Sequence, residues 1–114
     1  EIIEVIKNNK VLGIMLSCVS PENFQSNLSE IKKLGIPFGF KINGYLKTEP
    51  FPKINQIESD SSYLQPTEFL GKRKDLTPKK MFKFVKKFKL EGATILGGCC
   101  EVGPDHIKEF SSLK

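Results

Sequence analysis

Apolar segments alternate with helix starts along this chain, and this alternation limits the fold more than any other feature. Unbroken apolar runs of this length are typical of strands that are buried on both faces of a sheet. Buried strands that alternate with helices indicate an α/β protein with a parallel sheet and right-handed crossovers. The three segments that we predict to be strands are residues 10–18, 36–44 and 93–98.

Each predicted helix begins at a capping residue followed by proline, which suits the first helical position. These pairs are Ser20-Pro21, Thr77-Pro78 and Gly103-Pro104. Glycine, which commonly ends helices, stands at positions 35 and 92. Apolar residues recur at helical spacing, so each helix is expected to pack one face on the sheet. The residues expected to face inward are Phe24, Leu28, Ile31, Met81, Phe84, Val85, Phe88, Ile107, Phe110 and Leu113.

Five lysines lie on the opposite side of the second predicted helix: Lys79, Lys80, Lys83, Lys86 and Lys87. A basic amphipathic helix of this kind is compatible with a membrane surface. A helix that covers the neighbouring sheet explains the pattern better, because apolar strands flank it in sequence. Before this helix, residues 45–75 are predicted to form a long irregular loop, and such loops are usually functional or disordered.

Three parallel strands cannot cover themselves, because their sheet would expose apolar edges. The natural completion is a closed (β/α)₈ TIM barrel of roughly 250 residues. We therefore interpret residues 1–114 as a single partial domain, the last three β/α units of such a barrel. The chain also lacks an initiator Met and begins with what resembles the end of a helix. We expect it to be part of a longer protein, whose N-terminal barrel segment is required.

Composition disfavours several classes of protein. The net charge is +5 and comes mostly from lysine, without the arginine-rich tracts of nucleic-acid modules. No apolar run approaches the ~20 residues that a membrane helix needs, and the first residues do not form a secretory signal. We expect no nucleic-acid or membrane partner, and a cytoplasmic location.

The chain has three cysteines, Cys18, Cys99 and Cys100, an odd number that disfavours a disulfide framework. Two interpretations remain: buried small hydrophobic residues or metal ligands. All three lie at the carboxyl ends of predicted strands, which is where chemistry occurs in barrels. Consecutive strand residues point to opposite faces, so Cys99 and Cys100 can share a metal only where the backbone turns. We expect Gly97 and Gly98 to allow that turn.

Three thiolates suit Zn²⁺ and leave one ligand position open, as in catalytic sites. The open position would favour a soft ligand such as a substrate thiol, which zinc deprotonates.

Two segments closely resemble the zinc-dependent homocysteine S-methyltransferase family. They are "GGCCEVGPDHI" at residues 97–107 and "GIMLSCVSPENF" at residues 13–24. The resemblance implies that Cys18, Cys99 and Cys100 are the zinc ligands. It implies methyl transfer to homocysteine, giving methionine, from a small donor such as S-methylmethionine, betaine or a methylated folate. Asn43 matches an asparagine that the family carries near the end of its seventh strand and is a candidate substrate-binding residue; a simple turn residue before Gly44 is the alternative.

Some residues depart from the family pattern. Glu101-Val102 stands where many members have Gly-Thr, and residues 15–17 replace a more usual Val-Asn. Glu101 is either a partner of the thiolates or a surface carboxylate, and His106 is expected to cap its helix rather than bind metal. The alternatives to an active enzyme are a truncated, inactive barrel fragment and a structural zinc protein.

Overall fold

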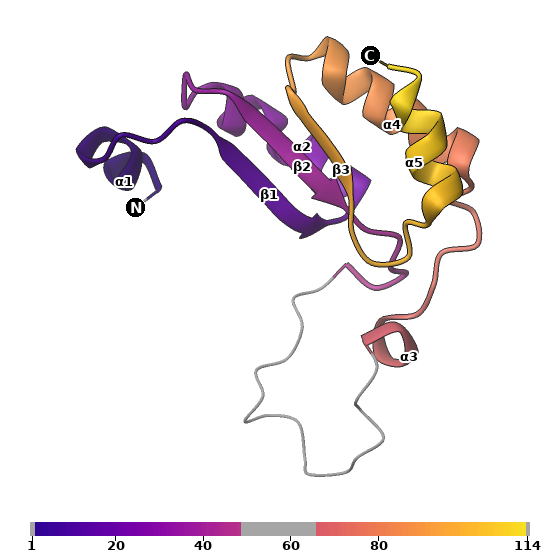
Figure 1. Ribbon diagram of the computed structural model, residues 1–114. Coiled ribbons are helices and arrows are strands. Elements are labelled where there is room, and N and C mark those ends of the chain that lie inside the picture. The colour runs from indigo at the N-terminus through magenta and orange to yellow at the C-terminus, as the bar shows by residue number, and fades with distance from the viewer. Residues whose placement is uncertain (1, 49–65, 114) are drawn as a thin grey trace, which may run out of the picture.

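The computed structural model describes residues 2–48 and 66–113, and the chain folds as an α/β protein (Figure 1). The elements are α1 (Ile2–Asn8), β1 (Ile14–Val19), α2 (Pro21–Lys32), β2 (Phe38–Ile42), α3 (Pro66–Leu70), α4 (Pro78–Leu90), β3 (Ile95–Gly98) and α5 (Pro104–Ser111). The described strands are therefore shorter than the apolar segments predicted from the sequence.

The three strands form one parallel sheet in the order β1-β2-β3, which confirms the predicted parallel arrangement. Leu16, Phe40 and Leu96 lie side by side across it. Since parallel strands all end at the same edge of a sheet, the residues that follow each strand meet there. This edge carries the three cysteines.

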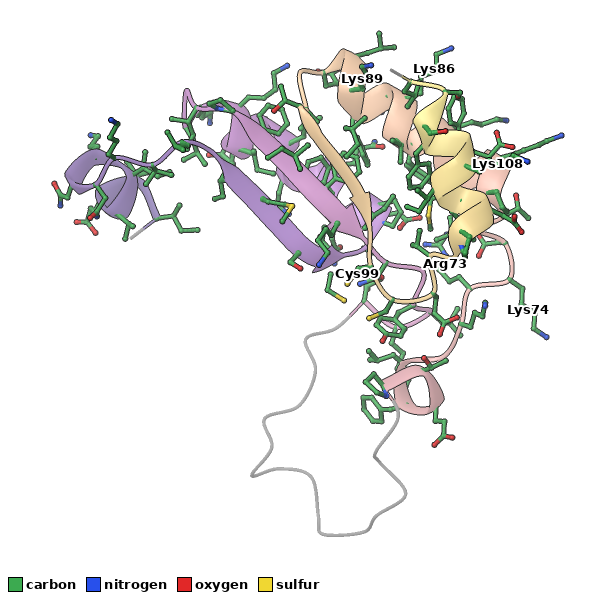
Figure 2. All side chains as sticks on the ribbon, in the orientation of Figure 1. Arg73, Lys74, Lys86, Lys89, Cys99 and Lys108 are labelled. Carbon is green, nitrogen blue, oxygen red and sulfur yellow. The ribbon has the colours of Figure 1, made fainter. Side chains whose placement is uncertain are left out.

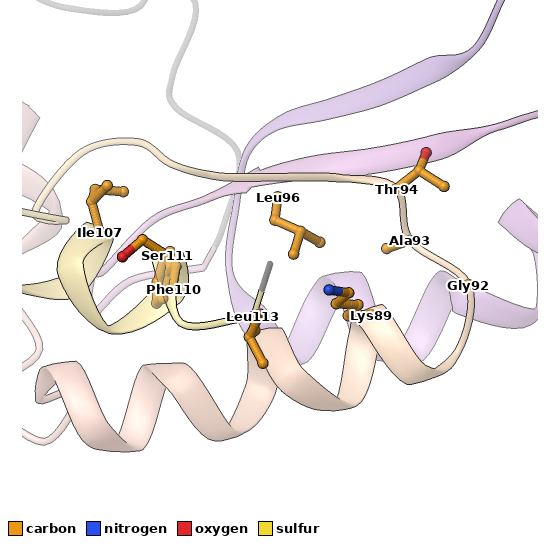
Figure 3. Close-up of a pocket in the computed structure, with 9 residues that line it drawn as sticks. All are labelled: Lys89, Gly92, Ala93, Thr94, Leu96, Ile107, Phe110, Ser111 and Leu113. Carbon is orange, nitrogen blue, oxygen red and sulfur yellow. The ribbon is translucent and has the colours of Figure 1, made fainter.

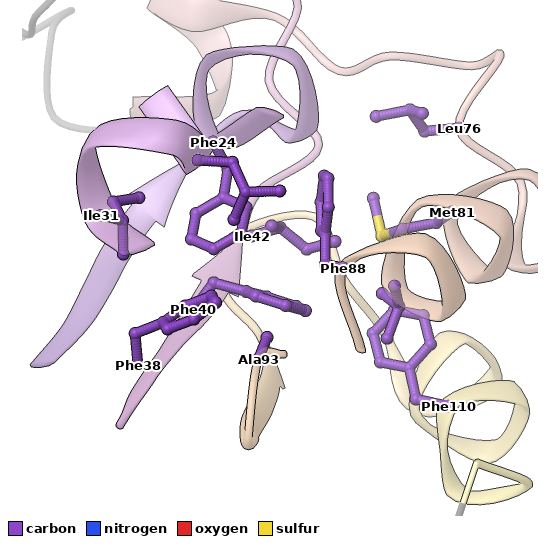
Figure 4. Close-up of a cluster of buried hydrophobic side chains, with 12 residues drawn as sticks. Phe24, Ile31, Phe38, Phe40, Ile42, Leu76, Met81, Phe88, Ala93 and Phe110 are labelled. Atoms are coloured by element: carbon purple, nitrogen blue, oxygen red, sulfur yellow. The ribbon is translucent and has the colours of Figure 1, made fainter. Parts of the chain in front are cut away.

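The hydrophobic core lies on one face of the sheet, between the strands and helices α2 and α4 (Figure 4). Phe24, Phe40 and Phe88 meet there edge to face, with ring centroids 4.8–5.4 Å apart. All three rings are fully buried. Burial of each such side chain contributes roughly 1.5–3 kcal/mol, so this triad anchors both helices to the central strand.

The other face of the sheet is open among the described residues, so the prediction of strands buried on both faces is wrong for them. Met15 and Ile95 are 44% and 45% exposed on this face. Gly39 lies between them in the register, and a Cβ there would come within 2.4 Å of the Ile95 Cβ. The helices pack on the opposite side, which leaves these apolar side chains without a covering layer.

The free edge of β3 borders a groove of about 680 Å³ between β3, α4 and α5 (Figure 3). Leu96, Phe110 and Leu113 contribute apolar surface to it. Ile107, which was predicted to face inward, is 45% exposed here, because the helix lies beside a sheet edge with no described neighbour. This groove is larger than the cavity at the cysteines but is lined by none of them.

The helix signals are confirmed. The Ser20 and Thr77 side chains accept hydrogen bonds from the backbone N–H groups of Asn23 and Lys80. Gly92 follows α4 with a φ of 106°, a conformation that suits glycine. Among the described residues, no helix combines the length and apolar character needed to cross a membrane.

The predicted loop 45–75 is only partly described, since residues 49–65 lie outside the described part. Within the rest, α3 replaces irregular chain, because Pro66 suits a helix start and Leu70 is buried. Tyr45 pairs with Lys72 in an antiparallel bridge, and this contact holds α3 near the carboxyl end of the sheet.

Candidate metal centre

The structure brings the three cysteine sulfurs together at the carboxyl end of the sheet. The Sγ atoms of Cys18 and Cys100 are 3.8 Å apart, and those of Cys99 and Cys100 are also 3.8 Å apart. All three lie within 4.8 Å of one another. Cys99 is labelled at this end of the sheet in Figure 2. Residues 81 positions apart in the chain thus form one cluster.

A β-bulge positions Cys18. Ser17 pairs with Lys41 and Val19 with Ile42, so Cys18 is an extra residue without a partner in β2. Its φ is 55°, in the left-handed region that side chains rarely occupy. Bulges of this kind redirect a side chain, and here Cys18 turns toward the other thiols while Val19 packs against the core.

A tight turn after β3 positions the other two cysteines. The Cys99 N–H donates to Ile42 O (2.7 Å), and the Val102 N–H donates back to Cys99 O (3.1 Å). The chain reverses direction at Glu101, whose φ is 63°. Cys18 and Glu101 are the two non-glycine residues with positive φ in the described chain. Backbone strain of this kind gathers at functional sites and costs about 1–3 kcal/mol per residue.

The role expected for Gly97 and Gly98 is therefore wrong in its mechanism. Neither residue has a positive φ, and both lie in or at the end of β3. Their missing side chains provide space instead. A Cβ on Gly98 would lie 2.2 Å from Val102 Cγ1, so the turn can fold back over the strand only because this position is glycine.

Asn43 braces the bulge from the end of β2. Its Nδ2 donates to the backbone oxygen of Cys18 (2.7 Å) and lies 3.6 Å from the Cys18 sulfur. Its Oδ1 accepts the Tyr45 N–H (3.2 Å). Asn43 is 7% exposed, so both ends of its amide are used inside the protein. The substrate contact implied by the resemblance stays a prediction.

Tyr45 is a site residue that the sequence analysis missed. It is 5% exposed, and its hydroxyl influences the thiol of Cys100. The Tyr45 hydroxyl is the main cause of a lowered pKa of Cys100, because it stabilises the thiolate. Burial is the main cause of the raised pKa of Tyr45 itself, about 12, so its hydroxyl keeps its proton. Its place two residues after Asn43, at the end of a strand, was the available signal.

The pKa of Cys18 is shifted in the opposite direction from that of Cys100. Partial burial of this thiol, followed by its contact with the Cys99 thiol, raises the pKa of Cys18 to about 11. The amide of Asn43 acts in the opposite direction by stabilising the thiolate. Without a bound cation, the site therefore disfavours the thiolate form of Cys18.

The two other candidate residues have structural partners. Glu101 accepts a hydrogen bond from the Thr67 hydroxyl (2.7 Å) and pairs with Lys72 (2.9 Å), which ties the cysteine turn to α3 and the residues that follow it. These contacts lower the pKa of Glu101. His106 accepts the Gly103 N–H at Nδ1 (3.2 Å), and its Nε2 contacts Leu76 O (3.0 Å). His106 thus caps its helix, as expected.

The donor atoms fit a zinc ion. Two sulfurs bound at ~2.3 Å to a tetrahedral zinc lie ~3.8 Å apart, which matches both short sulfur–sulfur distances here. Thiolates are soft ligands that select zinc over magnesium or calcium. The fold and the cluster together define an α/β protein with a candidate three-thiolate metal centre at the carboxyl end of a parallel sheet.

The family model described as homocysteine S-methyltransferase matches residues 1–113. The chain therefore belongs to the homocysteine S-methyltransferase family. Comparisons with curated proteins and with solved structures gave no match.

Proposed function

We propose that this chain forms part of an enzyme that transfers a methyl group to the thiolate of homocysteine and so makes methionine. The observation that carries the proposal is the convergence of Cys18, Cys99 and Cys100 within 4.8 Å, in a chain of this family. The three cysteines would hold Zn²⁺. Bound zinc would supply the Lewis acidity that keeps the homocysteine sulfur deprotonated at neutral pH.

Residues of this chain would hold the three metal-binding cysteines in position. The Asn43 amide holds the Cys18 bulge, and the turn closed by Val102 N–H holds Cys99 and Cys100. The buried Tyr45 hydroxyl lowers the pKa of Cys100 and so favours its thiolate form. No side chain at the site needs to act as a general base, and the one histidine is already engaged with Gly103 and Leu76.

The methyl donor would be S-methylmethionine, betaine or a methylated folate. A sulfur lone pair of homocysteine forms the new S–C bond while the donor's bond to its methyl carbon breaks. The electrons of that bond stay with the donor's sulfur or nitrogen. Such a displacement requires an in-line approach, so much of the rate would come from orientation.

We also propose that the chain is the last three β/α units of a (β/α)₈ barrel. Both sheet edges are free among the described strands, Met15 and Ile95 are exposed on the open face, and the groove beside β3 is apolar. Five preceding strands would cover these surfaces, and activity would require them. Reduced thiols are typical of reducing compartments, which supports a cytoplasmic location. The coding sequence upstream of Glu1 tests the barrel proposal directly.

X-ray absorption at the zinc edge tests the functional proposal. In the complete, zinc-loaded protein, added homocysteine is expected to replace a light-atom ligand with a fourth sulfur. A structural zinc site would give an unchanged spectrum. Methyl transfer from each labelled donor to homocysteine then identifies the donor, and the absence of transfer from all three would indicate an inactive protein.

A further inference from the structure

A cavity of about 490 Å³ lies beside Cys18, at the carboxyl ends of β1 and β2. Its wall includes Ser17, Cys18, Asn43 and Tyr45, so one end of it meets the candidate metal centre. Lys47 and Leu70 also line it. The cavity therefore connects the thiol cluster with the segment that follows β2.

Lys47 carries the one formal charge among the described residues that line this cavity. The other lining residues are apolar or neutral, and no described carboxylate is among them. No ion pair between Lys47 and a described acidic residue occurs in the structure. This lysine thus brings a positive charge to the cavity wall, and no acidic residue of the described ranges 2–48 and 66–113 pairs with it.

The position of Lys47 is held by two contacts. Its backbone N–H donates to Leu70 O (2.9 Å), next to the antiparallel bridge between Tyr45 and Lys72. Its ammonium lies 4.3 Å from the centroid of the Phe69 ring. A cation–π contact limits the directions of the ammonium but leaves its hydrogen-bond donors free for an anion.

We infer that this cavity binds the carboxylate of a substrate, with the Lys47 ammonium as its cation. The inference rests on the proposed function and adds a specificity-determining residue to it. Homocysteine carries a carboxylate, and so do all three classes of methyl donor considered above. A substrate that spans the cavity would place its reacting end near the sulfurs and its carboxylate at Lys47.

Direct binding tests the inference without turnover. Calorimetry on the complete protein compares L-methionine with 3-(methylthio)propylamine, which lacks the carboxylate. Lys47→Met is expected to raise the Kd of methionine about tenfold and to leave that of the amine unchanged. Lys47→Arg should keep methionine binding within a factor of about three. The matched control is Lys74→Met, at an exposed lysine that does not line the cavity and whose side chain points away from the molecule in Figure 2.

Kinetics then distinguish the source of the carboxylate. A raised KM for homocysteine in Lys47→Met assigns the subsite to the methyl acceptor, and a raised KM for the donor assigns it to the donor. Equal methionine Kd values in the wild type, Lys47→Met and Lys74→Met would overturn the inference. Absence of methyl transfer in the wild type, with the Lys47-dependent binding intact, would instead refute the proposed function.

Discussion

The side chain of Asn43 and the backbone of Cys18 are joined by a 2.7 Å hydrogen bond across two neighbouring strands. The bond satisfies a carbonyl that the bulge would otherwise leave without a partner in β2. It therefore links the one irregular position in β1 to the end of the central strand. Through this link, the geometry of a candidate metal ligand depends on a residue that is not itself a ligand.

Replacement of any one of the three cysteines by serine is expected to remove zinc and activity together. A serine hydroxyl does not ionise at neutral pH and is a poor zinc ligand. Metal analysis and methyl-transfer assays on the complete protein measure both properties. Ser17→Ala, next to Cys18, is the control and should keep its zinc. Normal turnover in Cys99→Ser or Cys100→Ser would show that the ligand assignment is wrong.

Asn43→Ala is expected to weaken zinc binding about 10- to 100-fold, the usual effect of losing a residue that orients a ligand. The substitution frees the Cys18 carbonyl and leaves the bulge without its brace. Competition with a chromogenic chelator measures the affinity. Asn27→Ala, on the exposed surface of α2, provides the comparison. An unchanged affinity in Asn43→Ala would mean that the bulge holds Cys18 without help.

The apparent zinc affinity should rise with pH, because protons compete with the metal for the sulfurs. The pKa of Cys18 is about 11, so this thiol is protonated at pH 7 and must release its proton to bind zinc. Calorimetry in buffers with different ionisation enthalpies counts the released protons. At about pH 10 the wild type should still release close to one proton from Cys18, whereas a thiol with the ordinary pKa of 9.0 would release about a tenth of a proton, so a count near zero there would contradict the raised pKa.

In the metal-free protein the same pKa predicts a loss of stability in alkali. The folded state raises the pKa of Cys18 above its ordinary value of 9.0, so it favours the neutral thiol. This contribution is fully present below about pH 9 and is lost as the pH rises through about 11. Urea unfolding at pH 7 and pH 11 should show a smaller pH effect for Cys18→Ser than for the wild type.

Gly98→Ala is expected to destabilise the fold by about 1–3 kcal/mol and to displace the cysteine turn. The new methyl group would lie within 2.2 Å of Val102 Cγ1, so either the turn or the strand must move. Denaturant unfolding measures the first effect and zinc content the second. Gly103→Ala, where a Cβ meets nothing within 4 Å, should cost less and keep the metal.

The 114-residue chain by itself is expected to be poorly stable or to associate, because the described residues leave apolar sheet surface uncovered. Analytical ultracentrifugation with thermal unfolding tests this expectation. A cooperative transition of a monomer would show that the three units are sufficient for an independent fold.

Much of the fold was predictable because its signals are local. The caps at Ser20 and Thr77 and the periodic stripe of α4 depend on residues within a few positions of each other. The exposure of Ile107 was not predictable in this way, because it depends on whether a neighbouring strand covers the edge of β3. The predicted strands were also longer than the observed ones, since apolar composition does not show where hydrogen bonding between strands begins and ends.

The sequence by itself determined the order of the three strands, the starts of helices α2, α4 and α5, and which three side chains are the candidate ligands, because capping pairs, periodicity and motif spacing are encoded along the chain. Tertiary structure decided how those ligands converge. The bulge at Cys18, the left-handed turn at Glu101 and the effect of Tyr45 on Cys100 depend on contacts between distant segments, and the Cys18 and Cys100 sulfurs meet across 82 residues of chain. Such geometry follows from strand register and packing across the sheet, which a linear pattern does not contain.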